Sequence, residues 1–277
     1  MRRLALALLL ATAPLAASQA QQPLRVGVDG TFAPHAFPRL EGGVQGFNVD
    51  IVNDLGRRLG RPIAMDAVGF AGLIPALNSG RYDFLGAPTS VTPERAANLL
   101  FTEGYLVSEY QFAIRRGSDP ITNLEMLRGK SLAVNKGSAY EGWARANAER
   151  YGFTIQAFDT QPDAVQAVIN GRAYATLAGN TVVRYAATRI RQLQPDYVLA
   201  DTRAEWALPF RIGNTELRNQ VEEALECMKL DGTLARFSET WFGTTPAADS
   251  MERTVQPGFG QVGKQGYEPT EHTPRCS

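Results

Sequence analysis

The sequence predicts an α/β protein built from two lobes, with a ligand cleft between them. Short apolar segments alternate with helical segments in two blocks, a pattern typical of parallel sheets whose faces are covered by helices. Residues 106–117, between the blocks, look like one long extended segment. The last strand and helix segments fit back into the first lobe, so we expect the chain to cross between lobes near residues 111–117 and 200–206. Two crossings make a hinge.

The first block alternates three predicted strands with three predicted helices. Each strand is a short apolar run, and each helix has apolar residues near helical spacing or a start and stop signal. In chain order the strands are 24–30, 62–69 and 82–87, and the helices are 48–60, 71–80 and 93–99.

The second block repeats this alternation, and the chain then returns to the first lobe. Its predicted strands are 131–135, 153–159 and 173–179, each followed by a helix, at 139–152, 162–172 and 181–190. Residues 197–202 close the block, 207–213 form another strand, and 216–243 form two helices with a break at Asp231 and Gly232. Residues 244–277 are rich in Pro, Gly, Thr and Gln, which indicates irregular structure on the surface or partial disorder.

We therefore expect five segments. They are a signal peptide (1–20), a discontinuous first lobe (24–112 and 205–243), a second lobe (113–204) and an irregular tail (244–277). The first segment has two arginines, a short apolar run and small residues before Ala20, which is the pattern of a secretory signal peptide. The protein is therefore expected in the periplasm.

Composition narrows the classes of partner. The chain has 277 residues, of which 44% are hydrophobic, and its 28 basic residues balance 28 acidic ones. Nothing in that balance favours nucleic acid or an anionic membrane as partner. With two histidines and two cysteines far apart in sequence, we expect neither a metal site nor a cofactor.

The two cysteines are candidates for a disulfide, since an exported protein meets an oxidising environment. Cys227 lies in a helical segment and Cys276 is next to last in the chain. We expect them to pair and to tie the tail to the body of the protein, and the alternative is a buried free thiol with a loose chain end. In the chain-entropy model, a disulfide that closes the loop between Cys227 and Cys276 stabilises the folded protein by at most about 4 kcal/mol.

The segment around Arg95 has the features of a site for a small carboxylate. Thr92 is a good N-cap, and Pro93 and Glu94 suit the first turn of a helix. Such a helix start directs unpaired N–H groups at an anion. Arg95 adds a fork of donors, with the hydroxyl groups of Ser90 and Thr92 beside it. The alternative is an ordinary helix start with a surface arginine.

Four stretches together resemble the bacterial extracellular solute-binding proteins of family 3, which deliver polar amino acids to ABC importers. They are LRVGVDGTFAPHAF, GFNVDIVNDLGRRLG, GLIPALNSGRYDFLGAPTSVTPERAANLLFTEGY and DGTLARFSETWFG. The resemblance implies the two-lobed periplasmic binding protein type II fold, closing on its ligand. It also implies membrane permease subunits of an ABC transporter as partners, and we expect a monomer.

The resemblance also assigns residues to the ligand. In the first lobe, Arg95 of the T-x-x-R motif would clamp the ligand carboxylate, Ser90 would add hydroxyl and backbone contacts, and the Pro88 carbonyl would face an amine. In the second lobe, Gly137 and Ser138 would reach the same carboxylate. Phe32 and Phe70 would stack on the ligand, although both are also plausible as core residues.

One part of the family pattern is missing. Amino-acid binders of this family carry an Asp from the second lobe that grips the ligand ammonium, and its position here is Gly179. The next residue, Asn180, is a candidate ligand contact that could accept one hydrogen bond from the ammonium. Either another acid serves, with Asp29 the obvious candidate, or the ligand has no α-ammonium. His35 also replaces an aromatic that is usually apolar, and it could bond either a ligand or the backbone.

The leading interpretation is a substrate-binding protein, without enzymatic activity, for a small carboxylate-bearing solute, foremost a polar amino acid. One alternative is a binding protein for a carboxylate without an α-ammonium, or an accessory or sensor subunit. A second is an enzyme similar to the periplasmic cyclohexadienyl dehydratases, which need an acid in the cleft. The tail is either a docking element for a partner or a plain extension.

Overall fold

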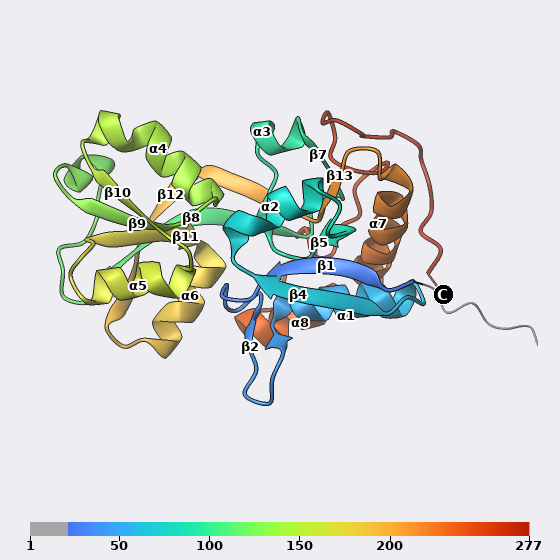
Figure 1. Ribbon diagram of the computed structural model, residues 1–277, viewed down its shortest axis with the longest axis horizontal. Coiled ribbons are helices and arrows are strands. Elements are labelled where there is room, and N and C mark those ends of the chain that lie inside the picture. The colour runs from blue at the N-terminus through green and yellow to red at the C-terminus, as the bar shows by residue number, and fades with distance from the viewer. Residues whose placement is uncertain (1–21, 277) are drawn as a thin grey trace, which may run out of the picture.

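The computed structural model describes residues 22–276, so the predicted signal peptide lies outside the described residues. It confirms the predicted α/β fold, with two lobes joined by two long strands (Figure 1). Among the described helices, none is both long and apolar enough to cross a bilayer.

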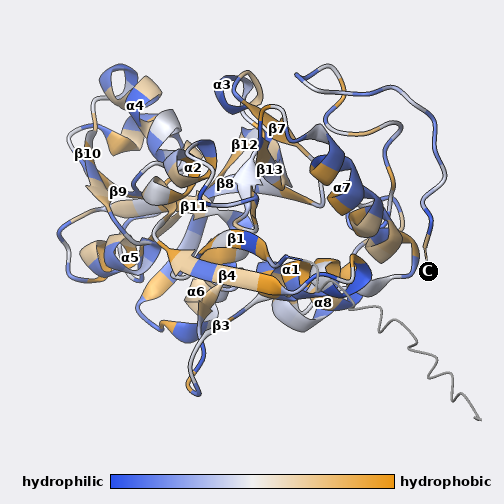
Figure 2. Cartoon of the chain, turned by 45° about the vertical axis from the view of Figure 1, so that its right-hand side comes forward, coloured by the Kyte–Doolittle hydropathy of each residue, from blue (hydrophilic) through white to orange (hydrophobic). Residues whose placement is uncertain are grey.

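The first lobe is centred on strand β1 (Leu24–Asp29). Parallel strands β4 (Ile63–Val68) and β5 (Phe84–Leu85) flank it, in the order β4-β1-β5. Strand β1 buries Leu24, Val26 and Val28 and is coloured mainly as hydrophobic in Figure 2. The other elements of this lobe are β2 (Phe37–Pro38), β3 (Val44–Gln45), α1 (Phe47–Arg58), α2 (Phe70–Asn78), α3 (Pro93–Ala96), β7 (Leu99–Phe101), β13 (Pro209–Arg211), α7 (Thr215–Leu230) and α8 (Thr233–Phe242).

The second lobe is built on part of a six-stranded sheet in the order β10-β9-β11-β8-β12-β6, whose last strand, β6 (Thr89–Ser90), lies in the first lobe. Strands β10 (Thr154–Phe158), β9 (Ser131–Asn135) and β11 (Ala175–Gly179) are parallel. Helix α4 (Ala139–Tyr151) covers one face, and helices α5 (Gln161–Ile169) and α6 (Asn180–Arg189) cover the other (Figure 1). A 3₁₀ turn, η1 (Leu124–Leu127), precedes β9.

The lobes are joined by the antiparallel strands β8 (Leu106–Arg115) and β12 (Leu193–Ala207). Near one end of this ladder, Trp206 lies opposite Leu106 on one side and opposite Ser90 of strand β6 (Thr89–Ser90) on the other. This register sets a large indole ring beside the predicted carboxylate site. The predicted second extended crossing is therefore part of one strand of 15 residues rather than a short segment.

Residues 244–276 lie along helix α7 and have little regular structure beyond an isolated bridge between Phe259 and Glu268 (Figure 1). The predicted disulfide is confirmed: Cys227 of α7 is bonded to Cys276, with 5.4 Å between the Cα atoms. The tail is thereby attached to the body of the protein near its end.

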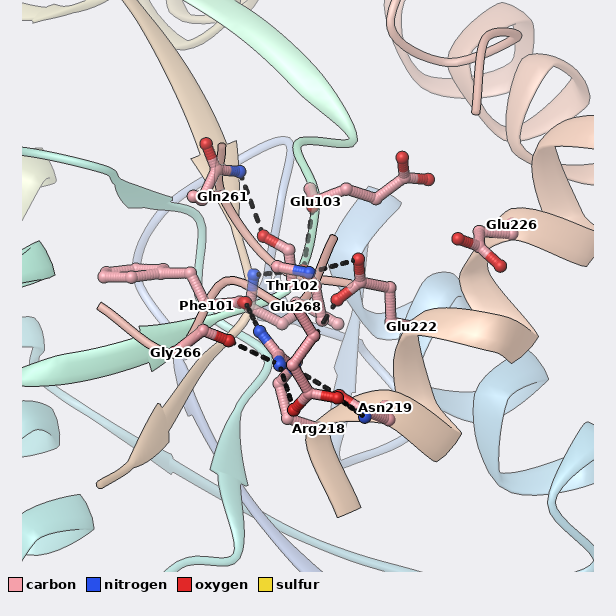
Figure 3. Close-up of polar contacts among 12 residues, drawn as sticks. Phe101, Thr102, Glu103, Arg218, Asn219, Glu222, Glu226, Gln261, Gly266 and Glu268 are labelled. Carbon is pink, nitrogen blue, oxygen red and sulfur yellow. Dashed lines mark hydrogen bonds and ion pairs between the residues drawn. The ribbon is translucent and has the colours of Figure 1, made fainter. Parts of the chain in front are cut away.

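Buried charged groups also hold the tail against the first lobe. The tail is therefore not an extension that only lies on the surface. The guanidinium of Arg218, which is fully buried, donates to the carbonyls of Phe101 and Gly266 (Figure 3). Glu222 accepts from the backbone N–H of Gly260 at 2.6 Å. Lys229 pairs with Glu103 at 2.7 Å and also donates to the carbonyl of Thr254. Because buried polar groups need partners, the tail completes the interior on this side.

Candidate binding site

Arg95 lies where the two lobes meet. Its guanidinium donates to the carbonyl of Ser90 in the first lobe at 3.2 Å and to the carbonyl of Gly137 in the second at 3.1 Å. The guanidinium carbon also lies 5.3 Å from the centre of the Phe70 ring. Among residues 22–276 no carboxylate is within ion-pair distance of Arg95. Burial lowers the pKa of Arg95, yet a guanidinium keeps its charge at neutral pH, so Arg95 is a cation without an anionic partner among these residues.

The helix that carries Arg95 is much shorter than predicted, because α3 has only four residues and ends at Ala96 rather than near residue 99. Thr92 caps it, accepting a hydrogen bond from the N–H of Arg95 at 3.3 Å. A single turn has a small dipole, so the expected attraction from this helix end is weak. The charge of Arg95 itself is therefore the main source of attraction for an anion at this site.

The second lobe faces Arg95 with the start of α4. Ser138 caps this helix of 13 residues: its Oγ accepts from the N–H of Glu141 at 3.1 Å and donates to the carbonyl of Asn135. Gly137 has a positive φ of 73°, and a Cβ there would lie 3.0 Å from the Cα of Ala71 in α2. Glycine is therefore needed for the close approach of the two lobes, and the cleft is closed.

A small cavity of about 20 Å³ remains inside the closed cleft. It is lined by residues of both lobes: Phe32, Phe70, Pro88, Ser90, Arg95, Asn135, Ser138, Ala139 and Tyr140. The structure thus brings together six of the predicted site residues, namely Phe32, Phe70, Pro88, Ser90, Arg95 and Ser138. Gly137 lines, with Arg95 and Ser138, a wider outer hollow of about 840 Å³ between α3 and α4. A volume of 20 Å³ holds about one water, so a ligand requires the lobes to part.

Asp29, at the end of β1, is buried and is linked to this cavity through Asn135, one of the lining residues. Its Oδ1 accepts from the N–H and the hydroxyl of Thr31 at 3.0 and 2.8 Å, and its Oδ2 accepts from Asn135 of the second lobe at 3.4 Å. The Oδ1 of Asn135 is buried and has no hydrogen-bond partner. Burial raises the pKa of Asp29, against the bonds from Thr31 and Asn135. The pair therefore presents a carboxyl group and an unpartnered amide oxygen near the cavity.

Asn180 does not reach the cavity. Its side-chain oxygen accepts from the next N–H in α6, and the residue lines a separate hollow together with Thr181, Arg184, Trp241 and Phe242. Gly179, just before it, is enclosed by Ser108, Trp206 and Tyr140. The structure thus places Asn180 away from Arg95.

His35 is enclosed rather than free to meet a ligand. Its ring nitrogens bond the Oδ1 of Asn48 at 3.0 Å and the hydroxyl of Thr181, in the second lobe, at 2.9 Å. Burial lowers the pKa of His35 to about 3. The histidine is therefore neutral and joins the two lobes.

Sequence reasoning missed Tyr140 and Asn135 as residues that line the cavity, and Trp206 as the residue whose indole N–H donates to the hydroxyl of Ser90. Tyr140 and Asn135 flank Gly137 and Ser138 closely, which was the available signal. Trp206 is more than 100 residues from Arg95 in sequence, and only the pairing of β12 with β6 brings it there. In the described part of the chain, no group of His, Cys, Asp and Glu residues could hold a metal ion.

The fold and the cleft define a two-lobed binding protein that closes on a small solute. The chain belongs to the bacterial extracellular solute-binding proteins, family 3, whose sequence model matches residues 24–244. It is 31% identical over 225 residues to the L-cystine-binding protein TcyJ of Escherichia coli (strain K12), covering 79% of this chain and 82% of that protein. It is also 31% identical over 230 residues to the putative amino-acid ABC transporter-binding protein PatH of Vibrio harveyi, covering 81% and 90%.

Solved structures give the same result. An ancestral arginine-binding protein bound to arginine matches with a TM-score of 0.76 and 31% identity, covering 80% of this chain and 98% of that one. An ancestral amino acid-binding protein, AncCDT-1, described as a precursor of cyclohexadienyl dehydratase, matches with a TM-score of 0.74 and 28% identity, covering 79% and 95%.

Proposed function

We propose that this protein is the periplasmic binding component of an ABC importer and captures a small carboxylate-bearing solute of the amino-acid class. The observation that carries this proposal is Arg95, a largely enclosed guanidinium at the junction of the lobes whose hydrogen bonds go to two carbonyls. A ligand carboxylate would give it the charged partner it lacks, and bidentate pairing with a carboxylate suits an arginine.

The other contacts follow from the lining of the cavity. Ser90 and Ser138 would place hydroxyl or backbone groups around the carboxylate, and Phe32 and Phe70 would enclose the apolar part of the ligand. An amine would lie against the Oδ2 of Asp29 and the unpartnered Oδ1 of Asn135. Three relatives are named as binding proteins for L-cystine, L-arginine and histidine, which supports an amino-acid ligand.

The proposal includes a division of the chain and a partner. The first lobe would comprise 24–112 and 205–243, the second 113–204, and residues 244–277 would form a tail fixed to the first lobe. The hinge would be β8 and β12, and the protein, exported by residues 1–20, would act as a monomer that docks on membrane permease subunits. It would have no enzymatic activity, a point that incubation with prephenate or arogenate checks directly.

The test is a pair of substitutions with a matched control. Arg95→Ala should abolish binding of the carboxylate ligand while the melting temperature stays near that of the unchanged protein, and Arg95→Lys should recover part of the affinity. Arg184→Ala removes an exposed arginine from the separate hollow and should change nothing. The ligand for this comparison is identified by native mass spectrometry of the protein as purified and by a thermal-shift screen of amino acids and simple carboxylates. Equal affinity in Arg95→Ala and Arg184→Ala would refute the carboxylate clamp.

A further inference from the structure

The tail contacts the chain at the points where the two long strands enter the first lobe. Just before β8, the carboxylate of Glu103 accepts from the backbone N–H of Gln256 at 2.6 Å. One residue earlier, the carbonyl of Thr102 accepts from the side chain of Gln261 at 2.9 Å (Figure 3). Thr102 and Glu103 are fully buried, and buried polar groups need their partners. The tail therefore holds the segment that leads into β8.

The same stretch of the tail reaches the end of β12. A Cβ at Gly104 would overlap the Sδ of Met251 and would lie 2.7 Å from the Oε2 of Glu205. The tail residue and the β12 residue therefore both pack against this glycine. The Nζ of Lys229 in α7 donates to the carbonyl of Gly104 at 2.6 Å and to that of Thr254 at 3.0 Å. The first-lobe ends of β8 and β12 thus form one packed unit with α7 and the tail.

Farther along, the ladder between β8 and β12 is interrupted. The pairing register shifts between Leu199 and Ala204, so residues 200–203 of β12 face only Glu109 of β8. A bulge of this kind breaks the ladder of hydrogen bonds and lets the strand bend. Most of this bulge lines the outer hollow, which Arg95 also lines. Bending at the bulge would therefore open the cleft beside the carboxylate site.

Tail residues beyond 244 lie outside the part of the chain that the family model matches. Building on the proposed function, in which β8 and β12 are the hinge, we infer that residues 251–261 act as a brace. The brace keeps the first-lobe ends of both strands fixed to the first lobe and confines bending to the bulge at 200–203. A single bending point restricts the open forms to a narrow range of lobe orientations. Closing on a ligand then orders fewer conformations, which lowers its entropic cost.

Hydrogen exchange of the ligand-free protein, followed by mass spectrometry, tests where the hinge is fixed and where it bends. In the unchanged protein, the amides of residues 200–203 should exchange at least tenfold faster than those of residues 102–108 and 204–208, because only the bulge opens locally. Equal exchange rates in the bulge and in the two strand ends would overturn the inference.

Met251→Ala removes a contact of the tail with the strand ends and leaves the buried bonds of Lys229 in place. Exchange at residues 102–108 and 204–208 should become at least fivefold faster in this variant. The matched control is Met126→Ala, at a half-buried position in η1 of the second lobe, and it should leave these rates unchanged. Thermal unfolding confirms that both variants are folded. If Met251→Ala is unfolded, the comparison within the unchanged protein decides the question.

A distance measurement between the lobes separates a brace from a merely local contact. Spin labels attached at Ala97→Cys in the first lobe and Glu149→Cys in the second lie at exposed positions, and the native cysteines are bonded to each other. By electron paramagnetic resonance of the ligand-free protein, the distribution of label distances should be at least half as wide again in Met251→Ala as in the unchanged protein and in Met126→Ala. Faster exchange with an unchanged width would show that the tail acts only locally, and would overturn the inference.

The brace and the carboxylate clamp fail separately in these experiments. Ligand binding and its loss in Arg95→Ala test the proposed function without any change to the tail. An overturned brace therefore leaves the proposed function standing. If Arg95→Ala binds its ligand as tightly as the unchanged protein while the exchange and distance results are as expected, the clamp fails and the brace stands.

Discussion

Arg95 and His35 show how single residues at the lobe junction acquire their properties from partners distant in sequence. The sequence around Arg95 carries a local signal, the T-x-x-R spacing, and its role as an anion site could be predicted. For His35 the sequence offered two readings, a ligand contact or a backbone bond. The structure shows instead two side-chain bonds, to Asn48 and Thr181, which are 13 and 146 residues away.

The hydrogen bonds around His35 determine its tautomer. The side-chain nitrogen of Asn48 donates to the carbonyl of Gly86 and to the hydroxyl of Tyr105, both at 2.7 Å, so the oxygen of Asn48 is the atom that faces His35. The Nδ1 of His35 must then carry the hydrogen, and its Nε2 accepts from the hydroxyl of Thr181. A neutral ring satisfies both contacts.

At the residue scale we predict that His35 makes the fold sensitive to acid. Its pKa is lowered to about 3 by burial, against an ordinary value near 6.5. The unfolded chain therefore binds more protons between pH 6.5 and 3, and stability falls as pH falls through that window by up to about 1.4 kcal/mol per pH unit. His35→Phe, which leaves the oxygen of Asn48 unpaired, should cost about 1–3 kcal/mol at pH 7. When the pH falls from 7 to 5, the free energy of unfolding of His35→Phe should decrease by about 2 kcal/mol less than that of the unchanged protein.

Urea unfolding at pH 7, 6 and 5 measures this difference. His272→Gln is the control, because the hydrogen bond and charge of Glu226, outweighing burial, raise the pKa of His272. A raised histidine pKa contributes stability at low pH that is lost as pH rises, so this control should change the pH dependence in the opposite direction. Parallel curves for His35→Phe and the unchanged protein would contradict the prediction.

At the scale of elements, the strands and helices of the two lobes could largely be predicted, whereas the packing of the tail could not. Hydrophobic periodicity is local, and it indicated β1, α1, β9, α4 and α7. The composition of residues 244–276 indicated irregular structure correctly, but it gave no sign of the buried charges beneath. Lys229 and Glu103, for example, are distant in sequence and meet only when α7 packs beside the end of β7.

We predict that the Lys229–Glu103 ion pair is essential for the packing of α7 and the tail. Both side chains are almost fully buried, Lys229 also donates to the carbonyls of Gly104 and Thr254, and Glu103 accepts from the N–H of Gln256 at 2.6 Å. Lys229→Met would leave the carboxylate of Glu103 buried and unpaired, which typically costs about 3–5 kcal/mol. Adding Glu103→Gln should recover most of that loss, because the remaining charge is removed.

Equilibrium unfolding in urea compares the single and double variants. The control is Arg128→Met, which breaks an exposed ion pair with Glu125 and should cost less than about 1 kcal/mol. If the double variant is no more stable than Lys229→Met alone, the loss does not come from an unpaired buried charge.

At the scale of the whole molecule, the closed cleft is stabilised by direct bonds between the lobes. Arg95 donates to the carbonyl of Gly137, Asn135 donates to Asp29, and Thr181 donates to His35. The two-lobed arrangement and the cleft could be predicted from the order of elements, since two crossings imply a hinge. These three bonds could not, because each depends on how two separately folded units meet.

The bond between Thr181 and His35 offers a way to shift the closed state without touching the ligand. Thr181 lines the hollow beside α8 rather than the ligand cavity, and valine has nearly the same shape as threonine. Thr181→Val leaves the buried Nε2 of His35 without a partner and should therefore destabilise the closed form by about 1–3 kcal/mol. Because a ligand that prefers the closed form must then offset this difference, its affinity should fall about 5- to 150-fold. In small-angle scattering, the ligand-free variant should have a larger radius of gyration than the unchanged protein.

The control is Thr188→Val, an exposed position in the same hollow. It should leave both the affinity and the radius of gyration unchanged. Equal effects of the two substitutions would show that the hydrogen bond does not govern closure.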